Sequence, residues 1–168
     1  TKLHGWFVPH EHPRAVVLFA HGNAGNLTHR IRILQELRYY HQVSVMIFDY
    51  RGHGKSEGSP SEAGILADAR AARKWVAHRG GISEDDIVLM GRSLGGGVMV
   101  DLAAKNGARG LILENTFTSL PDVAQNLMPL FPASLLMTYR LDSMSKIEQY
   151  KGPLLQSHGD KDQLIPIQ

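Results

Sequence analysis

The chain has 168 residues, enough for one domain with a sizeable core, and its 43% apolar and 20% charged residues are typical of a globular protein. Its formal net charge is +2 and its basic residues are spread along the sequence, which argues against a nucleic-acid-binding protein. No run approaches the roughly 18 consecutive apolar residues of a membrane span, and the absence of cysteine excludes disulfides and thiolate chemistry.

Short apolar runs alternate with amphipathic helical patterns. Six runs predict strands: residues 3–8, 15–20, 43–49, 87–90, 110–114 and 154–157. Most of them are continuously apolar, as expected for strands that are covered on both faces. Strands that alternate with helices predict an α/β fold with a mostly parallel central sheet and helices on both faces.

Three helices are expected between these strands. The first follows Asn26, a good N-cap, and the third follows Ser93 and ends before Gly107, a good C-cap. For the second we expect Ser59 to be the N-cap and Glu62 to close a capping box. Its inner face is predicted to comprise Ile65, Ala69, Ala72 and Val76. Its arginines are predicted to face water: Arg70, Arg73 and Arg79.

Residues 118–150 interrupt this alternation, because three prolines stand among Leu, Met and Phe in SLPDVAQNLMPLFPASLLMTYR. They predict short broken helices, a cap-like insertion within a single domain that spans residues 1–168. The apolar side chains of the insertion either cover the site and receive an acyl chain or pack onto the domain core. Both alternatives are open at this stage.

Ser93 directly follows an apolar run in IVLMGRSLGGG, residues 87–97. Gly91 and Gly95 stand two residues before and two residues after it, in the spacing G-x-S-x-G. A serine on a sharp strand-to-helix turn needs such neighbours, because a Cβ there would collide with adjacent backbone. Ligands of α/β sheets collect at the carboxyl ends of strands, where this turn lies. We therefore interpret Ser93 as a nucleophile, against the alternative of an ordinary glycine turn.

The sequence HGNAGN, residues 21–26, follows the second predicted strand. Acyl transfer builds negative charge on a carbonyl oxygen, which preset backbone N–H groups stabilise. We expect the N–H groups of Asn23 and Leu94 to form such an oxyanion hole, the latter at the positive end of a helix. His21 is expected to be structural rather than a catalytic base.

Two further loops follow predicted strands. DYRGHGKSEG, residues 49–58, lacks the first glycine of a phosphate-binding loop, so phosphate binding is discounted. In SHGDKDQLIP, residues 157–166, Asp162 is the expected acid that orients a catalytic histidine. Asp160 and Glu114 are the alternatives.

These motifs together resemble the α/β-hydrolase superfamily, especially its small esterase, monoacylglycerol-lipase and serine-aminopeptidase-like branch. The resemblance covers essentially the whole chain and rests on HGNAGN, DYRGHGKSEG, GRSLGG, ENTFTS and DQLIP in that order. It implies that Ser93 is the nucleophile, Asp162 the acid, and the N–H groups of Asn23 and Leu94 the oxyanion hole. The chain order in that family is Ser, then Asp, then His.

The expected histidine is missing from this order. All nine histidines precede Asp162, so we expect the base, with a last strand and helix, to follow Gln168. His53, in a loop at a strand end, is the best substitute within the chain. His158 is expected to belong to a turn.

The sequence thus predicts a serine hydrolase of carboxylic esters or thioesters, with a small-molecule ester or acyl compound as its substrate. One alternative is an aminopeptidase or acyltransferase that uses the same site, and another is a catalytically silent binding module. The chemistry needs side chains and water, so neither a cofactor nor a metal is expected. The cytoplasm is the favoured location, because there is no cysteine and the first residues do not form a signal peptide.

Overall fold

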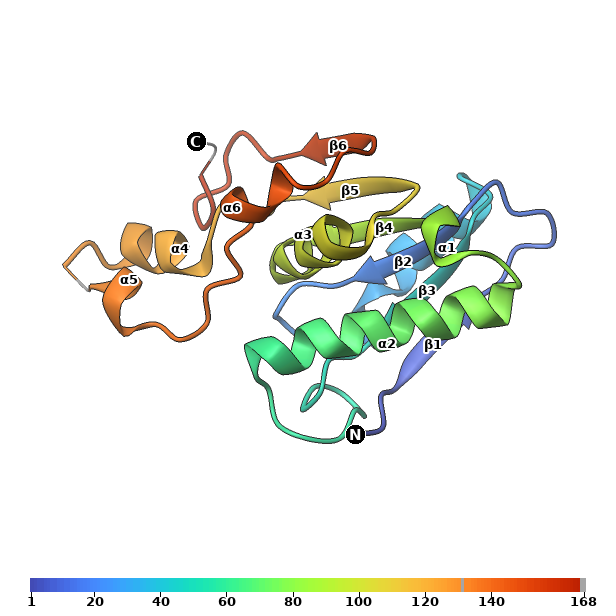
Figure 1. Cartoon of the computed structure of the whole chain (residues 1–168), viewed down its shortest axis with the longest axis horizontal. Helices are drawn as coiled ribbons and strands as arrows, with labels where there is room; N and C mark the ends of the chain where they lie inside the picture. Colours follow the sequence, from blue (N-terminus) through green and yellow to red (C-terminus); the bar gives the residue numbers. More distant parts are fainter. Residues whose placement is uncertain (131, 167–168) are drawn as a thin grey trace.

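The computed structural model describes residues 1–130 and 132–166, which form a six-stranded sheet with helices on both faces (Figure 1). The strands are β1 (Gly5–Val8), β2 (Val16–Ala20), β3 (Ser44–Phe48), β4 (Ile87–Arg92), β5 (Gly110–Glu114) and β6 (Leu154–Ser157). The α-helices are α1 (Ile31–Tyr39), α2 (Glu62–Gly80), α3 (Leu94–Asn106), α4 (Leu120–Leu127), α5 (Ala133–Leu136) and α6 (Met144–Ile147). Short 3₁₀ helices η1 (Leu27–Arg30) and η2 (Glu84–Asp86) precede α1 and β4.

The strand order is β1-β3-β2-β4-β5-β6. β1 runs antiparallel to β3, whereas every other neighbouring pair is parallel. The mostly parallel α/β sheet that the sequence predicts is confirmed, and the six strands lie where they were expected. Because β2 to β6 are parallel, the loops that follow them meet at one edge of the sheet.

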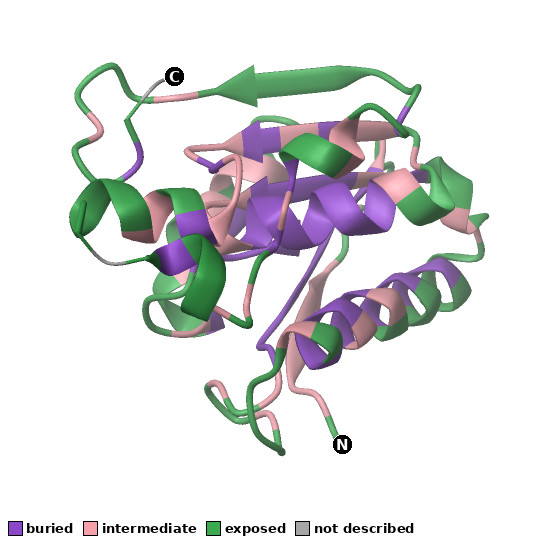
Figure 2. Cartoon of the chain, turned by 60° about the vertical axis from the view of Figure 1, so that its left-hand side comes forward, coloured by how far each residue is buried: buried purple, intermediate pink, exposed green. Residues whose placement is uncertain are grey.

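Two apolar clusters cover the two faces of the sheet. One face packs against α2 and α3, with Leu18, Leu89 and Leu111 in the contact, and the other packs against α1, with Phe19 and Leu34. Figure 2 shows α3 and the central strands as the buried part of the chain. Inward-facing residues of α2 are buried as predicted: Ile65, Ala69, Ala72 and Val76.

Strand β6 does not match the expectation of strands covered on both faces. All four of its residues are exposed, with Leu154 at 46% and Leu155 at 62% (Figure 2). β6 pairs with β5, but within residues 1–130 and 132–166 neither apolar cluster includes its side chains. Its apolar residues therefore satisfy the strand pattern without entering the core.

The N-cap predicted for the second helix is wrong. α2 begins at Glu62 behind Ser61, whose Oγ accepts a hydrogen bond of 3.1 Å from the Gly64 N–H. Ser59 lies outside the helix because Ser61 is still extended, at φ −156° and ψ 151°. The carboxylate of Glu62 instead accepts hydrogen bonds from the backbone N–H groups of Arg140 and Leu141, which ties α2 to the segment after α5.

The other expected caps are confirmed. Asn26 accepts a hydrogen bond of 2.9 Å from the Thr28 N–H at the start of η1. Gly107 ends α3 at φ 67°, a backbone conformation that glycine adopts without steric cost.

Arg73 was predicted to face water, and the structure places it in the interior instead. The residue is 1% exposed, and its guanidinium donates hydrogen bonds of 2.8 Å to the carbonyls of Gly107 and Glu84 and of 3.2 Å to that of Asn106. These carbonyls lie at the end of α3 and in η2, where helix ends leave acceptors unpaired. Arg73 therefore joins α2, α3 and η2.

We expect Arg73→Leu to lower the free energy of unfolding by about 3 kcal/mol, because the buried guanidinium and its hydrogen bonds to three backbone carbonyls are lost. Lys74→Leu, at an exposed neighbouring position of α2, should change it by less than about 0.5 kcal/mol. Urea unfolding of both variants measures the difference. Equal stability of the two would contradict a structural role of the Arg73 side chain.

Candidate active site

Ser93 occupies the sharp turn between β4 and α3. Its backbone has φ 54° and ψ −118°, a conformation that costs a non-glycine residue about 1–3 kcal/mol. The Ser93 N–H donates to the Glu114 carbonyl at 3.0 Å, and the Ser93 carbonyl accepts from Gly96 N–H at 2.8 Å and from Thr116 Oγ1 at 3.1 Å. Contacts on both sides thus hold the strained conformation.

The flanking glycines allow the turn to approach its neighbours closely. A Cβ at Gly95 would lie 2.0 Å from the Ala20 carbonyl oxygen at the end of β2, and a Cβ at Gly91 would lie 2.4 Å from the Gly95 carbonyl oxygen. Both distances are far below van der Waals contact. The G-x-S-x-G spacing is therefore a requirement of packing at this turn.

The loop after β2 lies directly beside the serine. A Cβ built on Gly22 would be 3.4 Å from the Ser93 Cβ, so the backbone that leads to Asn23 passes next to the hydroxyl-bearing side chain. Leu94 is the first residue of α3, where the N–H has no partner within its own helix. Within the described ranges, neither the Asn23 nor the Leu94 N–H donates to a protein acceptor.

A buried polar group braces the loop after β2. His21 is fully buried, its Nδ1 donates to the Gly22 carbonyl at 2.7 Å, and its Nε2 lies 3.4 Å from Asp49 Oδ1. Asp49 Oδ1 also accepts from the Leu27 N–H at 2.8 Å, and the Tyr50 hydroxyl donates to the His21 carbonyl at 2.8 Å. Burial lowers the pKa of His21, which outweighs the effects of the Gly22 carbonyl and the Asp49 carboxylate. His21 is thus neutral, and because its proton is on Nδ1, its Nε2 has no hydrogen-bond partner among the described residues.

Sequence reasoning missed Asp49 and Tyr50, which it treated as the start of a glycine-containing loop. One signal was available, because an aspartate directly after a buried apolar strand needs a polar partner. The structure identifies that partner as the loop that carries Asn23.

Asp162 lies in the turn that follows β6. Its Oδ1 accepts hydrogen bonds from the N–H groups of Ile165 at 2.9 Å and Leu164 at 3.0 Å, and its Oδ2 accepts one of 2.9 Å from Asn115 Nδ2. The Ile165 N–H, followed by the Asn115 amide, lowers the pKa of Asp162 below its usual value. The carboxylate is therefore ionised and oriented at neutral pH.

The two alternative acids have different surroundings. Glu114 is held by Arg92, whose Nη2 and Nε lie 2.7 Å and 2.8 Å from Glu114 Oε2. Asp160 is exposed, and its carboxylate forms no hydrogen bond within residues 1–130 and 132–166. Of the three carboxylates, Asp162 has the most donors directed at it.

The histidines considered as substitutes for a base have structural contacts. His158 Nε2 donates to the Ile165 carbonyl at 2.6 Å and lies 3.7 Å from Asp162 Oδ2. His53 Nδ1 lies 3.3 Å from the Arg51 carbonyl in the loop after β3. In the part of the chain that is described, no histidine side chain forms a hydrogen bond with Ser93.

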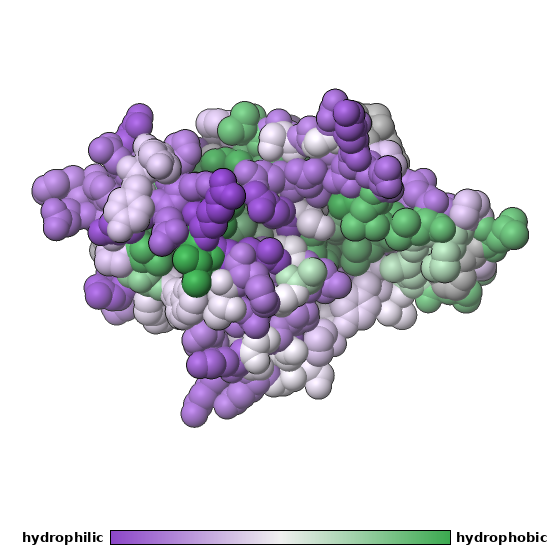
Figure 3. Space-filling model, turned by 180° about the vertical axis from the view of Figure 1, so that it is seen from behind, coloured by the Kyte–Doolittle hydropathy of each residue, from purple (hydrophilic) through white to green (hydrophobic). Residues whose placement is uncertain are grey.

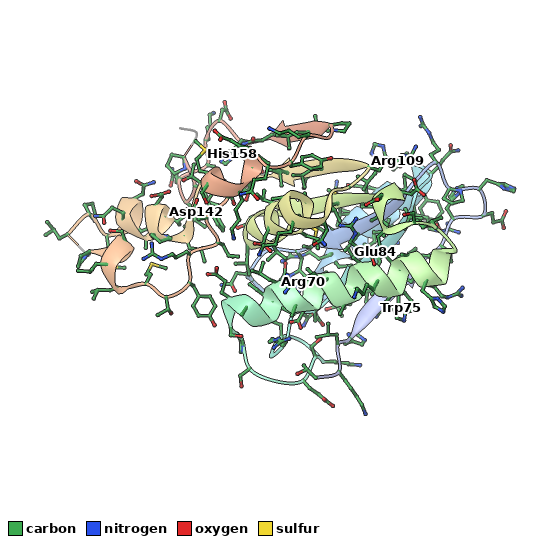
Figure 4. The ribbon with its side chains drawn as sticks, viewed as in Figure 1. Arg70, Trp75, Glu84, Arg109, Asp142 and His158 are labelled. Atoms are coloured by element: carbon green, nitrogen blue, oxygen red, sulfur yellow. The ribbon has the colours of Figure 1, made fainter. Side chains whose placement is uncertain are left out.

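A cavity of about 340 Å³ opens between α3, the α4–α6 segment and the turn that holds Asp162. His158, labelled in Figure 4, lies on its wall in the loop beyond β6. Ser93 and Asp162 are not among the described residues that line this cavity, whose apolar lining comprises Val100, Leu113, Phe117, Val123, Met144, Ile147, Ile165 and Pro166. No cluster of His, Asp and Glu suited to a metal ion occurs among the described residues, and no helix there is long and apolar enough to cross a membrane.

Comparison with known proteins places the chain in the α/β-hydrolase superfamily. Residues 11–143 match the family model described as serine aminopeptidase, S33. The chain is 36% identical over 181 residues to the uncharacterized protein YfhR of Escherichia coli K12, covering 100% of the chain and 61% of YfhR. It is also 36% identical over 183 residues to the alpha/beta hydrolase domain-containing protein WAV2 of Arabidopsis thaliana, covering 99% of the chain and 59% of WAV2.

Among solved structures, the esterase Pf2001 of Pyrococcus furiosus superposes with a TM-score of 0.77 at 21% identity, covering 98% of this chain and 67% of the esterase. This likeness shows the fold. The chain spans about 60% of the length of the two curated relatives.

We expect Gly95→Ala to destabilise the protein by about 1–3 kcal/mol, because the new Cβ would overlap the Ala20 carbonyl. Gly80→Ala is the matched control, since a Cβ there meets its nearest atom at 3.6 Å and its φ is negative. Thermal unfolding of both variants checks this difference. A Gly95→Ala protein with unchanged melting temperature would show that the tight contact at the turn is not required.

Proposed function

Because this chain belongs to the serine aminopeptidase S33 family of α/β hydrolases, we propose that it carries the nucleophile of a serine hydrolase that cleaves carboxylic esters or thioesters. The observation that supports this most strongly is the strained turn at Ser93, with φ 54°, between the end of β4 and the start of α3. Strain of this kind persists where the surrounding contacts maintain it, and it is common at reactive residues.

In the proposed reaction, Ser93 Oγ attacks the acyl carbon and its proton passes to a histidine. The negative charge that develops on the carbonyl oxygen is stabilised by the N–H groups of Asn23 and Leu94. The histidine then protonates the leaving alcohol or thiol, and an acyl-enzyme remains on Ser93. Water, activated by the same histidine, releases the acid and restores the serine.

We propose that this histidine follows Gln168, in the family order Ser, Asp, His. Asp162 is the proposed acid that orients it. The three donors around the Asp162 carboxylate support this assignment, because they fix its orientation and favour its ionised form.

Residues 118–150 are the proposed cap of the site. They contain α4, α5 and α6 between β5 and β6, and Val123, Met144 and Ile147 of this segment line the cavity of about 340 Å³. The apolar part of this lining suits an acyl chain, and its carboxylate, Asp122, already accepts hydrogen bonds from the hydroxyls of Thr118 and Ser119, which favours ester over peptide substrates. The other face of the segment is exposed and apolar, with side chains that gather at one end of the molecule (Figure 3): Leu127, Met128, Leu130, Leu135 and Leu136.

We expect Ser93→Ala to abolish labelling by a fluorophosphonate without unfolding the protein that contains this chain, because the probe reacts with an activated serine. Asp162→Asn should slow labelling by about 10²-fold or more, since the histidine loses its orienting charge. Asp160→Asn is the matched control and should label at the wild-type rate. Labelling that survives Ser93→Ala would refute the assignment of the nucleophile, and a catalytically silent module would not label at all.

A substrate panel separates ester hydrolysis from peptide hydrolysis. We expect kcat/KM for a p-nitrophenyl ester with a medium-length acyl chain to exceed that for p-nitrophenyl acetate by at least about tenfold, since one to two buried methylenes contribute about this much, and aminoacyl p-nitroanilides to be cleaved more slowly than either ester. A preference for the anilides would instead support the aminopeptidase alternative.

A further inference from the structure

Asn115 joins three elements at the carboxyl edge of the sheet. It follows the last residue of β5, its N–H donates to the Ser157 carbonyl at the end of β6 at 3.0 Å, and its side-chain Nδ2 donates to Asp162 Oδ2 at 2.9 Å. Its φ is 46°, in the left-handed region that asparagine tolerates better than most side chains. With this backbone conformation, the side chain of Asn115 is directed at the turn that holds Asp162.

The hydrogen bonds of Asp162 show what this amide contributes. Two backbone N–H groups, from Leu164 and Ile165, bind Oδ1, whereas Asn115 is the donor that the described residues provide to Oδ2. Each carboxylate oxygen has about two lone-pair directions, so Oδ2 retains one for a further donor. A further N–H donor, such as that of the proposed histidine, can bind Oδ2 in this direction.

The residue before Asn115 connects this arrangement to the nucleophile. The Glu114 carbonyl accepts the Ser93 N–H at 3.0 Å, so two consecutive residues hold the backbone of the serine and the carboxylate of the acid. Any shift at the end of β5 would change the separation of Ser93 and Asp162. The pair Glu114–Asn115 therefore sets the relative position of the two groups.

We propose that Asn115 is a positioning residue for catalysis, which orients Oδ2 of Asp162 toward the histidine while the adjacent Glu114 carbonyl fixes the Ser93 turn. This inference rests on the proposed function. The titratable and charged side chains near Asp162 are His158, at 3.7 Å from Oδ2, together with Asp160 and Lys161 of the same turn.

The test uses the complete protein that contains this chain. Two variants separate the contribution of the Asn115 side-chain amide from that of its backbone conformation. Asn115→Gly removes the amide and favours the same positive φ, so the turn is retained. Asn115→Asp keeps the shape but replaces the donor with a second carboxylate. Gln42→Gly is the matched control, because it also removes a side-chain amide at a positive φ, here 55°, from an exposed residue in the loop before β3.

We expect Asn115→Gly to lower kcat for a p-nitrophenyl ester by about tenfold or more, with KM changed less than about twofold, because a misoriented acid affects the transition state. Asn115→Asp should also move the acidic limb of the kcat/KM profile to higher pH by about one unit, since added negative charge raises the pKa of the histidine. Gln42→Gly should match the wild type in both measurements. Circular dichroism verifies that each variant is folded.

The outcomes distinguish this inference from the proposed function on which it rests. If fluorophosphonate labels Ser93 but Asn115→Gly keeps the wild-type kcat and Asn115→Asp keeps the wild-type acidic limb, the role of Asn115 is refuted and the hydrolase proposal stands. If wild-type Ser93 is not labelled, both are refuted. A loss of kcat in Asn115→Gly with no shift in Asn115→Asp would also overturn the inference, because it indicates a purely structural role.

Discussion

The arrangement of the candidate site depends on one steric constraint, the close approach of the Ser93 turn to the end of β2. A Cβ at Gly95 would overlap the Ala20 carbonyl, so α3 can begin this near to the sheet only where its second residue has no side chain. The same approach brings the loop after β2 beside Ser93. The turn, its strained φ and its neighbouring loop are therefore consequences of a single contact.

Buried polar groups then stabilise the loops around this contact. Asp49 accepts a hydrogen bond from the Leu27 N–H, and Asn115 donates one to Asp162, so the loops after β2 and β6 are each fixed by a side chain that follows another strand. Polar groups inside a protein are costly unless they are paired, and here the pairing also determines loop position. The scaffold thus places backbone N–H groups, a hydroxyl and a carboxylate along one edge of the sheet.

The sequence predicts those features that have local causes. Strand positions follow from continuous apolar runs, and the turn at Ser93 follows from its two glycines, so both agree with the structure. Features that depend on distant residues were missed or wrong. Arg73 looked solvent-facing because its carbonyl partners at Glu84, Asn106 and Gly107 are remote in sequence. Likewise, no local pattern reveals that Asn115 reaches Asp162, 47 residues away.

The most direct test of the account is the detection of an acyl group on Ser93 itself. Trypsin cleavage after Arg92 and Lys105 releases residues 93–105, a peptide with one serine and no threonine, tyrosine, cysteine or histidine. After brief incubation of the complete protein with p-nitrophenyl acetate and acid quenching, mass spectrometry should find this peptide with one added acetyl group on Ser93. Ester hydrolysis without acetylation of this peptide, or acetylation elsewhere that tracks turnover, would contradict the account.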